Sequence, residues 1–152
     1  MSNTKLKVVE LQTSETYDLR TAVLRADTPT SDPKYAEDTK QGTVHLGIFD
    51  ENKTLIATST WVINPWQQDP SSPAVQLRGM AVATSHQKSG LGKLLLDAGI
   101  VHAKTLDAKY IWAKARDSAL DFYLCNNFVS VGDGFTEGVT QMPHHLVVKK
   151  LS

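Results

Sequence analysis

The strongest constraint on the fold is a change of hydrophobic period near residue 90. Residues 75–83 form an apolar run of strand length, whereas from Leu91 to Leu106 the apolar residues recur every three or four positions. The second pattern predicts an amphipathic helix that ends near Asp107, and residues 110–115 predict another strand. A strand, a helix and a strand in succession predict a crossover that makes the two strands parallel.

The rest of the chain alternates between short apolar runs and polar or proline-rich loops. Strand candidates over 42–49, 54–63 and 75–83 follow in quick succession, which predicts an antiparallel meander. Before the meander we expect a strand over 6–11, a helix capped by Ser14, and a loop over 28–40 with a short helix around 34–37. An exposed loop over 64–74 separates the second and third strands of the meander. Near the end we expect a helix over 118–125 capped by Asp117, and closing strands over 128–131 and 145–151 around a glycine-rich bend at Gly132, Gly134 and Gly138. This order, βα(α)βββαβαββ, predicts an α+β (mixed α/β) class with a central, mixed but mostly antiparallel sheet of six to seven strands and helices on both faces.

The composition limits the partners that the chain can attract. Its 152 residues suit a single domain over 1–152, and 16 basic residues balance 16 acidic ones, so no net positive field draws it to nucleic acid or an anionic membrane. No run approaches the roughly 20 apolar residues of a spanning helix, and the start lacks the apolar core of a secretory signal, so we expect a cytoplasmic protein. Cys125 is the only cysteine, which excludes an internal disulfide and a cysteine-based zinc cage, and we expect it to be a small buried hydrophobic residue.

The turn Gln87-Lys88-Ser89-Gly90-Leu91-Gly92 joins the first strand of the crossover to its helix. The N–H groups in the first turn of a helix have no intrahelical partner, so an anion can dock there. Gly90 and Gly92 would let phosphate oxygens approach the backbone, and Lys88 and Lys93 would add positive charge. The turn is therefore a candidate phosphate site, although a plain tight turn would contain the same glycines.

Two common phosphate motifs do not fit this turn. A Walker A loop needs glycine at position 87 and Ser or Thr at position 94, where Gln87 and Leu94 stand. A dinucleotide fingerprint needs glycine at position 95, which is Leu95. A nucleotide would have to be held in another way.

The same turn resembles the Arg/Gln-x-x-Gly-x-Gly/Ala signature of the GNAT acetyltransferases, and the strand Leu77-Arg78-Gly79-Met80-Ala81-Val82 before it is of the expected kind. Residues 115–128 resemble the family's A-x-x-x-A-x-x-F-Y-x-x-x-G-F segment, with Asn127 in the place of its usual glycine. The pair Pro143-His144 before the last strand is similar to one branch of that family. The resemblance extends from residue 75 to the end, and only the order of elements supports it over the first 74 residues.

The resemblance implies the acyl-CoA N-acyltransferase (GNAT) fold, acetyl-CoA as the acyl donor, no metal, and direct attack by a primary amine of a small molecule or a protein within a ternary complex. It also implies that the pantetheine arm adds to strand 75–83 where this strand and 110–115 splay apart, and that the turn holds the pyrophosphate. The implied cofactor contacts are Met80, Ala81, Val82, Gln87, Lys88, Ser89, Gly90, Leu91, Gly92, Lys93, Asp117, Phe122 and Tyr123.

The resemblance further implies that Tyr123 is the acid that protonates the departing thiolate. An unperturbed phenol has a pKa of about 10, so it is protonated at neutral pH. Glu137 and His144 are the candidates for the base that receives the proton of the amine, directly or through water. Each has a structural alternative, in which Tyr123 packs in the core, Glu137 is solvated, and His144 lies on an edge strand.

Three other functions stay compatible with the sequence. The first is transfer from another acyl-CoA or to another acceptor, such as an O-linked one, and the second is a non-catalytic module that binds acyl-CoA as a sensor. The third is an α/β interaction protein, which acetyl-CoA would not stabilise against heat. A Tyr123→Phe variant that binds acetyl-CoA normally but transfers acetyl slowly would favour the enzyme. An exposed edge strand near the C-terminus would allow a homodimer.

Overall fold

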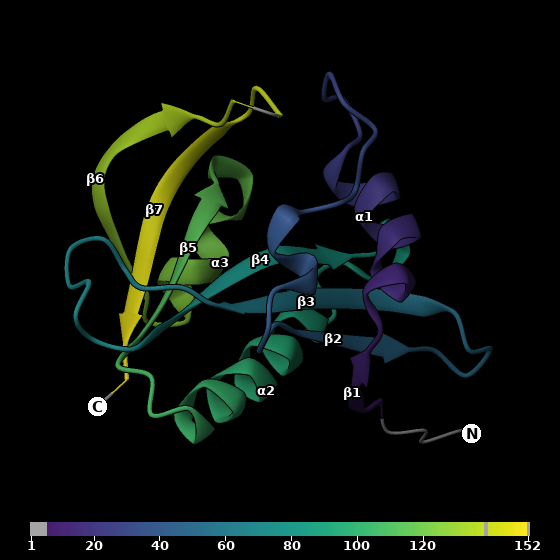
Figure 1. The fold of residues 1–152 in the computed structure, drawn as a ribbon. Coiled ribbons are helices and arrows are strands. Elements are labelled where there is room, and N and C mark those ends of the chain that lie inside the picture. The colour runs from purple at the N-terminus through teal and green to yellow at the C-terminus, as the bar shows by residue number, and fades with distance from the viewer. Residues whose placement is uncertain (1–5, 139, 152) are drawn as a thin grey trace.

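The strands form one mixed sheet in the computed structural model, which describes residues 6–138 and 140–151 (Figure 1). The seven strands of these ranges follow the order β1-β2-β3-β4-β5-β7-β6, and all neighbours are antiparallel except β4 and β5, which are parallel. The predicted meander and parallel crossover are therefore confirmed. The strands are β1 (Val8–Leu11), β2 (Val44–Phe49), β3 (Leu55–Ile63), β4 (Ala74–Val82), β5 (Tyr110–Arg116), β6 (Val129–Thr136) and β7 (Pro143–Lys150).

Helices cover both faces of the sheet, as predicted. Thr60 and Trp61 are neighbours in β3 and point to opposite faces, and Thr60 bonds to a side chain of α1 whereas Trp61 packs against α2. α3 joins α2 on the second face, where both contribute to the main hydrophobic core. The helices are α1 (Tyr17–Leu24), α2 (Leu91–Thr105) and α3 (Leu120–Cys125), with 3-10 turns η1 (Thr13–Thr16), η2 (Ala36–Thr39), η3 (Thr84–His86) and η4 (Asp117–Ala119). Among the residues that the structure describes, none of these helices has the length and apolarity needed to cross a bilayer.

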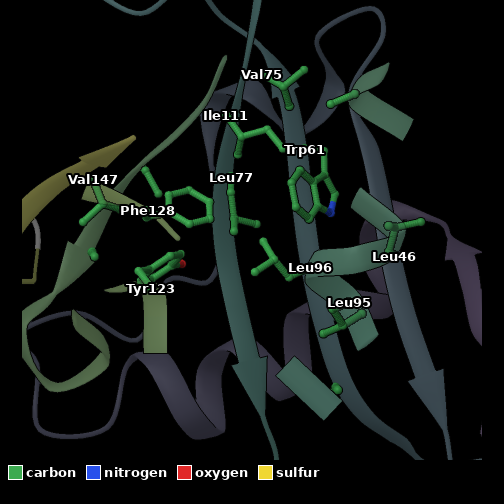
Figure 2. Packing of buried hydrophobic residues seen from close by; sticks show 14 of the residues in the cluster. Leu46, Trp61, Val75, Leu77, Leu95, Leu96, Ile111, Tyr123, Phe128 and Val147 are labelled. Carbon is green, nitrogen blue, oxygen red and sulfur yellow. The ribbon is translucent and has the colours of Figure 1, made fainter. Parts of the chain in front are cut away.

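Trp61 lies at the centre of the contact between β3 and α2 (Figure 2). Its side chain is fully buried, and its indole N–H donates to the Ser59 hydroxyl at 2.8 Å. A Cβ atom added to Gly99 of α2 would lie 1.8 Å from the Trp61 ring, far inside van der Waals contact. Glycine at this position is therefore what lets α2 approach the sheet over the tryptophan.

We expect Gly99→Ala to lower the melting temperature strongly, because the rigid, enclosed Trp61 ring cannot yield to the new methyl group. Overpacked cores lose about 1–3 kcal/mol, and the upper end corresponds to roughly 6–12 °C for a chain of this size. Gly138→Ala is the matched control, since a Cβ atom there meets nothing within 4 Å. Equal melting temperatures of the two variants would contradict the packing of Trp61 on α2.

Two predicted helix caps are wrong. Ser14 lies inside η1, which precedes α1, and the start of that turn is held by the main chain of Gln12, whose N–H donates to the Glu15 carboxylate at 2.8 Å. Asp117 opens η4, and Arg116 occupies the cap position. The Asp117 carboxylate instead accepts a hydrogen bond of 2.6 Å from Nδ1 of His145. His145, from the neighbouring strand β7, thus binds the carboxylate that was expected to cap the helix.

The predicted glycine-rich bend is also displaced. Gly132 and Gly134 belong to β6, where the pairing with β7 shifts between Val131 and Phe135. Gly132 has a φ of 77°, which suits a bulge residue without a side chain. The chain reverses later, where the N–H of Gln141 donates to the carbonyl of Glu137 at 2.8 Å.

Cys125 is exposed, so the expectation of a small buried residue is wrong. Tyr123, two positions earlier in α3, points into the core. Successive residues in a helix are about 100° apart, so a residue two positions from the buried face points to solvent.

Candidate active site

The sheet opens between β4 and β5 (Figure 1). The two strands pair only where Ala74–Gln76 lies beside Tyr110–Trp112. β4 then continues to Val82 and β5 to Arg116 without further pairing between them. We call the side of β4 that faces β5 beyond Gln76 the open edge of β4. An extended chain can add to such an edge through main-chain hydrogen bonds.

A β-bulge bends β4 along its open edge. The register between β3 and β4 shifts so that Gly79 and Met80 together lie opposite Ser59. Gly79 has a φ of 59°, a conformation that glycine adopts without strain. Bulges of this kind redirect a strand and often lie next to functional sites.

The direction of the main-chain groups follows from the ladder with β3. The N–H of Ala83 donates to the carbonyl of Ile56 in β3 at 2.8 Å. Main-chain groups of alternate residues point to opposite edges of a strand, so those of Val82 and Met80 point to the open edge. The main-chain groups of Ala81 point to β3 instead. The geometry thus favours main-chain contacts of a ligand with Met80 and Val82, and it does not favour a main-chain contact with Ala81.

Residues 87–90 of the predicted phosphate turn lie exposed between η3 and α2, and the buried Leu91 begins the helix. Lys88 and Gly90 have left-handed φ angles of 65° and 87°, and α2 begins directly after Gly90. The first helical bond runs from the N–H of Leu94 to the carbonyl of Gly90 at 3.2 Å, so the N–H groups before Leu94 point out of the helix start. A Cβ atom on Gly90 would meet nothing within 4 Å, so an anion has room to approach.

Several side chains of the turn are engaged within the chain itself. Gln87 donates from Nε2 to the carbonyl of Val82 at 3.1 Å, and the Ser89 hydroxyl donates to the carbonyl of His86. Lys93 pairs with Asp97 at 3.0 Å on the exposed surface of α2. These bonds shape the turn, so main-chain N–H groups and the exposed Lys88 are the donors that it presents to a ligand.

Gly92 has a packing role that its sequence pattern does not reveal. A Cβ atom at this position would lie 3.1 Å from the Phe122 ring, so the glycine lets α3 approach the first turn of α2. Phe122 in turn contacts the Tyr123 ring edge to face, with centroids 5.3 Å apart. The phosphate turn and the candidate acid are therefore linked through one aromatic contact.

Tyr123 is 6% exposed and packs against Phe128 with ring centroids 5.2 Å apart. Figure 2 shows its hydroxyl oxygen pointing from α3 toward the strand that carries Leu77. Burial and, to a smaller degree, electrostatic interaction with Tyr35 raise the pKa of Tyr123. The phenol is therefore protonated throughout the physiological range and can donate a proton or a hydrogen bond.

The two candidate bases lie near the end of β5. His144 is directly opposite Arg116 in the ladder of β5 and β7, so both side chains are on the face that α1 covers, where Arg116 donates to the carbonyl of Leu24. Nδ1 of His144 donates to the carbonyl of Met142 at 2.7 Å, which leaves Nε2 of a neutral ring to accept a proton. Glu137 interacts electrostatically with Arg116. The candidate bases and Tyr123 thus approach the opening from opposite faces of the sheet.

Sequence reasoning did not single out Tyr35, which lies at the same opening. A Cβ atom on Gly79 would lie 3.0 Å from the Tyr35 ring, so the tyrosine rests on the bulge of β4. Guanidinium groups surround it, with the central carbon of Arg78 at 4.2 Å and that of Arg20 at 4.5 Å from the ring centroid. Tyr35 stands in a polar loop that contains prolines, and nothing in that pattern distinguishes it from a surface residue.

Comparisons with known proteins agree with this architecture. Residues 9–128 match the model of the acetyltransferase (GNAT) family. The uncharacterized N-acetyltransferase YitI of Bacillus subtilis (strain 168) is 25% identical over 145 residues, which cover 95% of each chain. A structure of a putative N-acetyltransferase from Lactobacillus plantarum has a TM-score of 0.79 and 17% identity, covering 98% of this chain and 100% of that one.

A third similar structure is that of the NatC complex bound to Gag peptide and CoA, with a TM-score of 0.72, 13% identity and coverage of 98% of this chain and 100% of that chain. At these low identities, the likeness to both structures shows a shared fold. The family match covers most of the chain, including the open edge of β4, the phosphate turn and Tyr123. The chain belongs to the GNAT acetyltransferase family and has its acyl-CoA N-acyltransferase fold.

Proposed function

We propose that this protein transfers an acetyl group from acetyl-CoA to a primary amine by direct attack within a ternary complex. One observation carries the proposal: the open edge of β4 runs toward the start of α2, so an extended arm on this edge would meet main-chain N–H groups at its phosphate end. GNAT acetyltransferases take acyl groups from acyl-CoA, and the NatC complex, which shares the fold, has CoA bound in its structure.

The residues at the opening fit the two ends of such a donor. The main-chain groups of Met80 and the N–H of Val82, whose carbonyl accepts from Gln87, would bind the pantetheine arm as a neighbouring strand does. The N–H groups between Lys88 and Lys93, at the positive end of α2, would bind the pyrophosphate, with Gly90 leaving space for it. When bound, acetyl-CoA supplies a thioester that is reactive toward amines.

The acid and the base would act from the two faces of the sheet. Tyr123, on the face of α2 and α3, would donate its phenolic proton to the departing thiolate. On the face of α1, Nε2 of His144 or the carboxylate of Glu137 would take the proton of the attacking amine, directly or through water. The amine must reach this face as the free base, which is scarce at pH 7 for an alkyl amine with a pKa of about 10.4.

The proposal is tested by a thermal shift with acetyl-CoA, followed by measurement of free thiol release across a panel of primary amines. A ligand at 100 times its Kd stabilises the folded state by about 2.7 kcal/mol, which is roughly 5–10 °C for this chain. Stabilisation without thiol release from any amine would favour a sensor. A faster reaction with propionyl-CoA or succinyl-CoA would favour a different acyl donor.

Gly90→Ala tests the phosphate turn specifically. The φ of 87° disfavours any residue with a Cβ atom by about 1–2 kcal/mol, so the turn must relax and its N–H groups move. We expect the Kd for acetyl-CoA to rise about 10-fold or more, because charge-assisted hydrogen bonds to the pyrophosphate are each worth about 1.5–3 kcal/mol.

Gly132→Ala is the matched control, since Gly132 has a φ of 77° and equally open surroundings but lies in β6. The two variants should lose similar stability, and only Gly90→Ala should bind acetyl-CoA more weakly in isothermal titration calorimetry. Equal affinity in both variants would remove the turn from the binding site.

A further inference from the structure

All four arginines of the chain gather around Tyr35, although they are scattered along the sequence. The central guanidinium carbons of Arg78, Arg20 and Arg25 lie 4.2, 4.5 and 5.4 Å from the centroid of its ring. Arg116 interacts electrostatically with Tyr35. We call these five residues the arginine cluster. The planar guanidinium group binds carboxylates through two parallel hydrogen bonds, which a lysine cannot do.

The arginine cluster borders the opening on the face of α1. The Tyr35 ring would lie 3.0 Å and Arg20 Nε 3.1 Å from a Cβ atom on Gly79, so both rest on the bulge of β4. Arg116 ends β5 and is paired in the ladder with His144. The cluster thus lies between the bulge and the candidate bases, next to the place where these bases would meet the amine.

Arg20 and Arg78 each form an ion pair with a carboxylate. Arg20 is fully buried and makes two hydrogen bonds to Asp38, at 2.8 and 2.9 Å. Arg78 pairs with Glu37. Arg116 interacts electrostatically with Glu137, and Arg25 donates to main-chain carbonyls. In addition, Nε of the buried Arg20 has no hydrogen-bond partner within residues 6–138 and 140–151.

Arg25 and Arg116 converge on one carbonyl group. Both donate to the carbonyl of Leu24 at the end of α1, Arg25 at 3.4 Å, and Arg25 also donates to the carbonyl of Asp32 at 2.8 Å. A helix end benefits from a nearby cation, but one arginine would serve this purpose. Burial lowers the pKa of Arg116 and Arg25 contributes in the same direction, whereas Tyr35 and Glu137 raise it. An anion between Arg25 and Arg116 would be an attractive partner for both guanidinium groups.

We infer that Arg116 and Arg25, beside Tyr35, bind a carboxylate of the acceptor, so that the substrate class is a primary amine with a nearby carboxylate, such as an α-amino acid. This inference rests on the proposed acetyl transfer. With the carboxylate held there, the amine lies toward Glu137 and His144. The amine nitrogen bonds to the acetyl carbon as the carbon–sulfur bond breaks. The base takes the amine proton, and the thiolate receives one from Tyr123, which gives an N-acetyl amino acid and CoA.

The test compares α-amino acids with their amides and with the corresponding amines that lack the carboxyl group, by thiol release with acetyl-CoA. We expect kcat/KM to be at least about 10-fold higher for the acids, since a charge-assisted pair contributes about 1.5–3 kcal/mol. Arg116→Gln should raise KM for the acids about 10- to 100-fold and so remove most of their advantage in kcat/KM over the amides. Lys114→Gln, which removes an equal charge from an exposed position in the same strand, should change neither.

A second readout does not depend on turnover. N-acetyl amino acids should raise the melting temperature of the wild-type protein and not that of Arg116→Gln, while acetyl-CoA stabilises both proteins. Amides used as well as acids, aminoalkyl phosphates preferred over acids, or an equal loss for acids and amides in Arg116→Gln would each overturn the inference and leave acetyl transfer intact. Absence of thiol release with every amine would overturn the proposed function and this inference together.

Discussion

Tyr123→Phe should lower kcat for acetyl transfer by about 100- to 1,000-fold, because positioned general acids contribute factors of about 10² to 10⁴. The phenol is buried and protonated, so the variant loses a proton donor and keeps the ring contacts with Phe122 and Phe128. We therefore expect the Kd for acetyl-CoA and the melting temperature to stay close to those of the wild-type protein. Steady-state thiol release and thermal shift measure the two effects separately.

Tyr110→Phe provides the control for the loss of a phenol. The Tyr110 hydroxyl donates to Asp69 at 2.8 Å at the start of β5, at the far end of that strand from Arg116. This variant should keep its kcat within about 2-fold, in line with the small effects of most surface substitutions. A Tyr123→Phe protein as active as Tyr110→Phe would show that Tyr123 is a packing residue and that another group, or water, protonates the thiolate.

The second large effect concerns stability. Asp38→Asn should lower the free energy of unfolding by about 3–5 kcal/mol, or roughly 6–20 °C in melting temperature, because it leaves the charge of Arg20 without its partner in the protein interior. Asp38 also accepts a hydrogen bond of 2.9 Å from the N–H of Tyr35. The substitution should therefore loosen the loop that places Tyr35 over β4.

The pH dependence of this effect has a definite sign. Burial alone would raise the pKa of Asp38, but hydrogen bonds from Arg20 and from the Tyr35 N–H, with the positive charge nearby, outweigh burial and lower it. Because the pKa of Asp38 is lower in the folded protein than its value of about 3.9 in the unfolded chain, the ionised carboxylate stabilises the fold above that pH. This stabilisation is lost as the pH falls through the folded-state pKa. The difference between wild type and Asp38→Asn should thus be largest near neutral pH and narrow below about pH 4.

Asp97→Asn makes the same chemical change in an exposed ion pair, that of Lys93 and Asp97. Exposed pairs contribute about 0–1 kcal/mol, so its melting temperature should barely change. Equal effects of the two substitutions in thermal unfolding monitored by circular dichroism would show that the buried pair of Arg20 and Asp38 stabilises the fold no more than an exposed pair does.

The sequence allowed most of the fold to be predicted, since hydrophobic period and turn residues are local signals. The helix after Gly90 and the parallel crossover around it follow from the change of period at that residue. The failures involve partners distant in sequence. The local sequence favours Asp117 as a helix cap, but its carboxylate is hydrogen-bonded to His145, which β7 places beside it.

The candidate site was predictable only in part, for the same reason. The phosphate turn and Tyr123 belong to continuous motifs, so their resemblance to a family could be recognised. The arginine cluster has no spacing pattern, because α1, a loop, β4 and β5 each contribute to it. Only the topology brings these segments together.

The contact of Gly99 with Trp61 has a consequence for the evolution of this chain. Because the indole ring occupies the space of the missing side chain, neither position can change freely while the other stays as it is. Relatives with a larger residue at the first position should carry a smaller one than tryptophan at the second. An alignment of homologues should therefore show these two positions changing together.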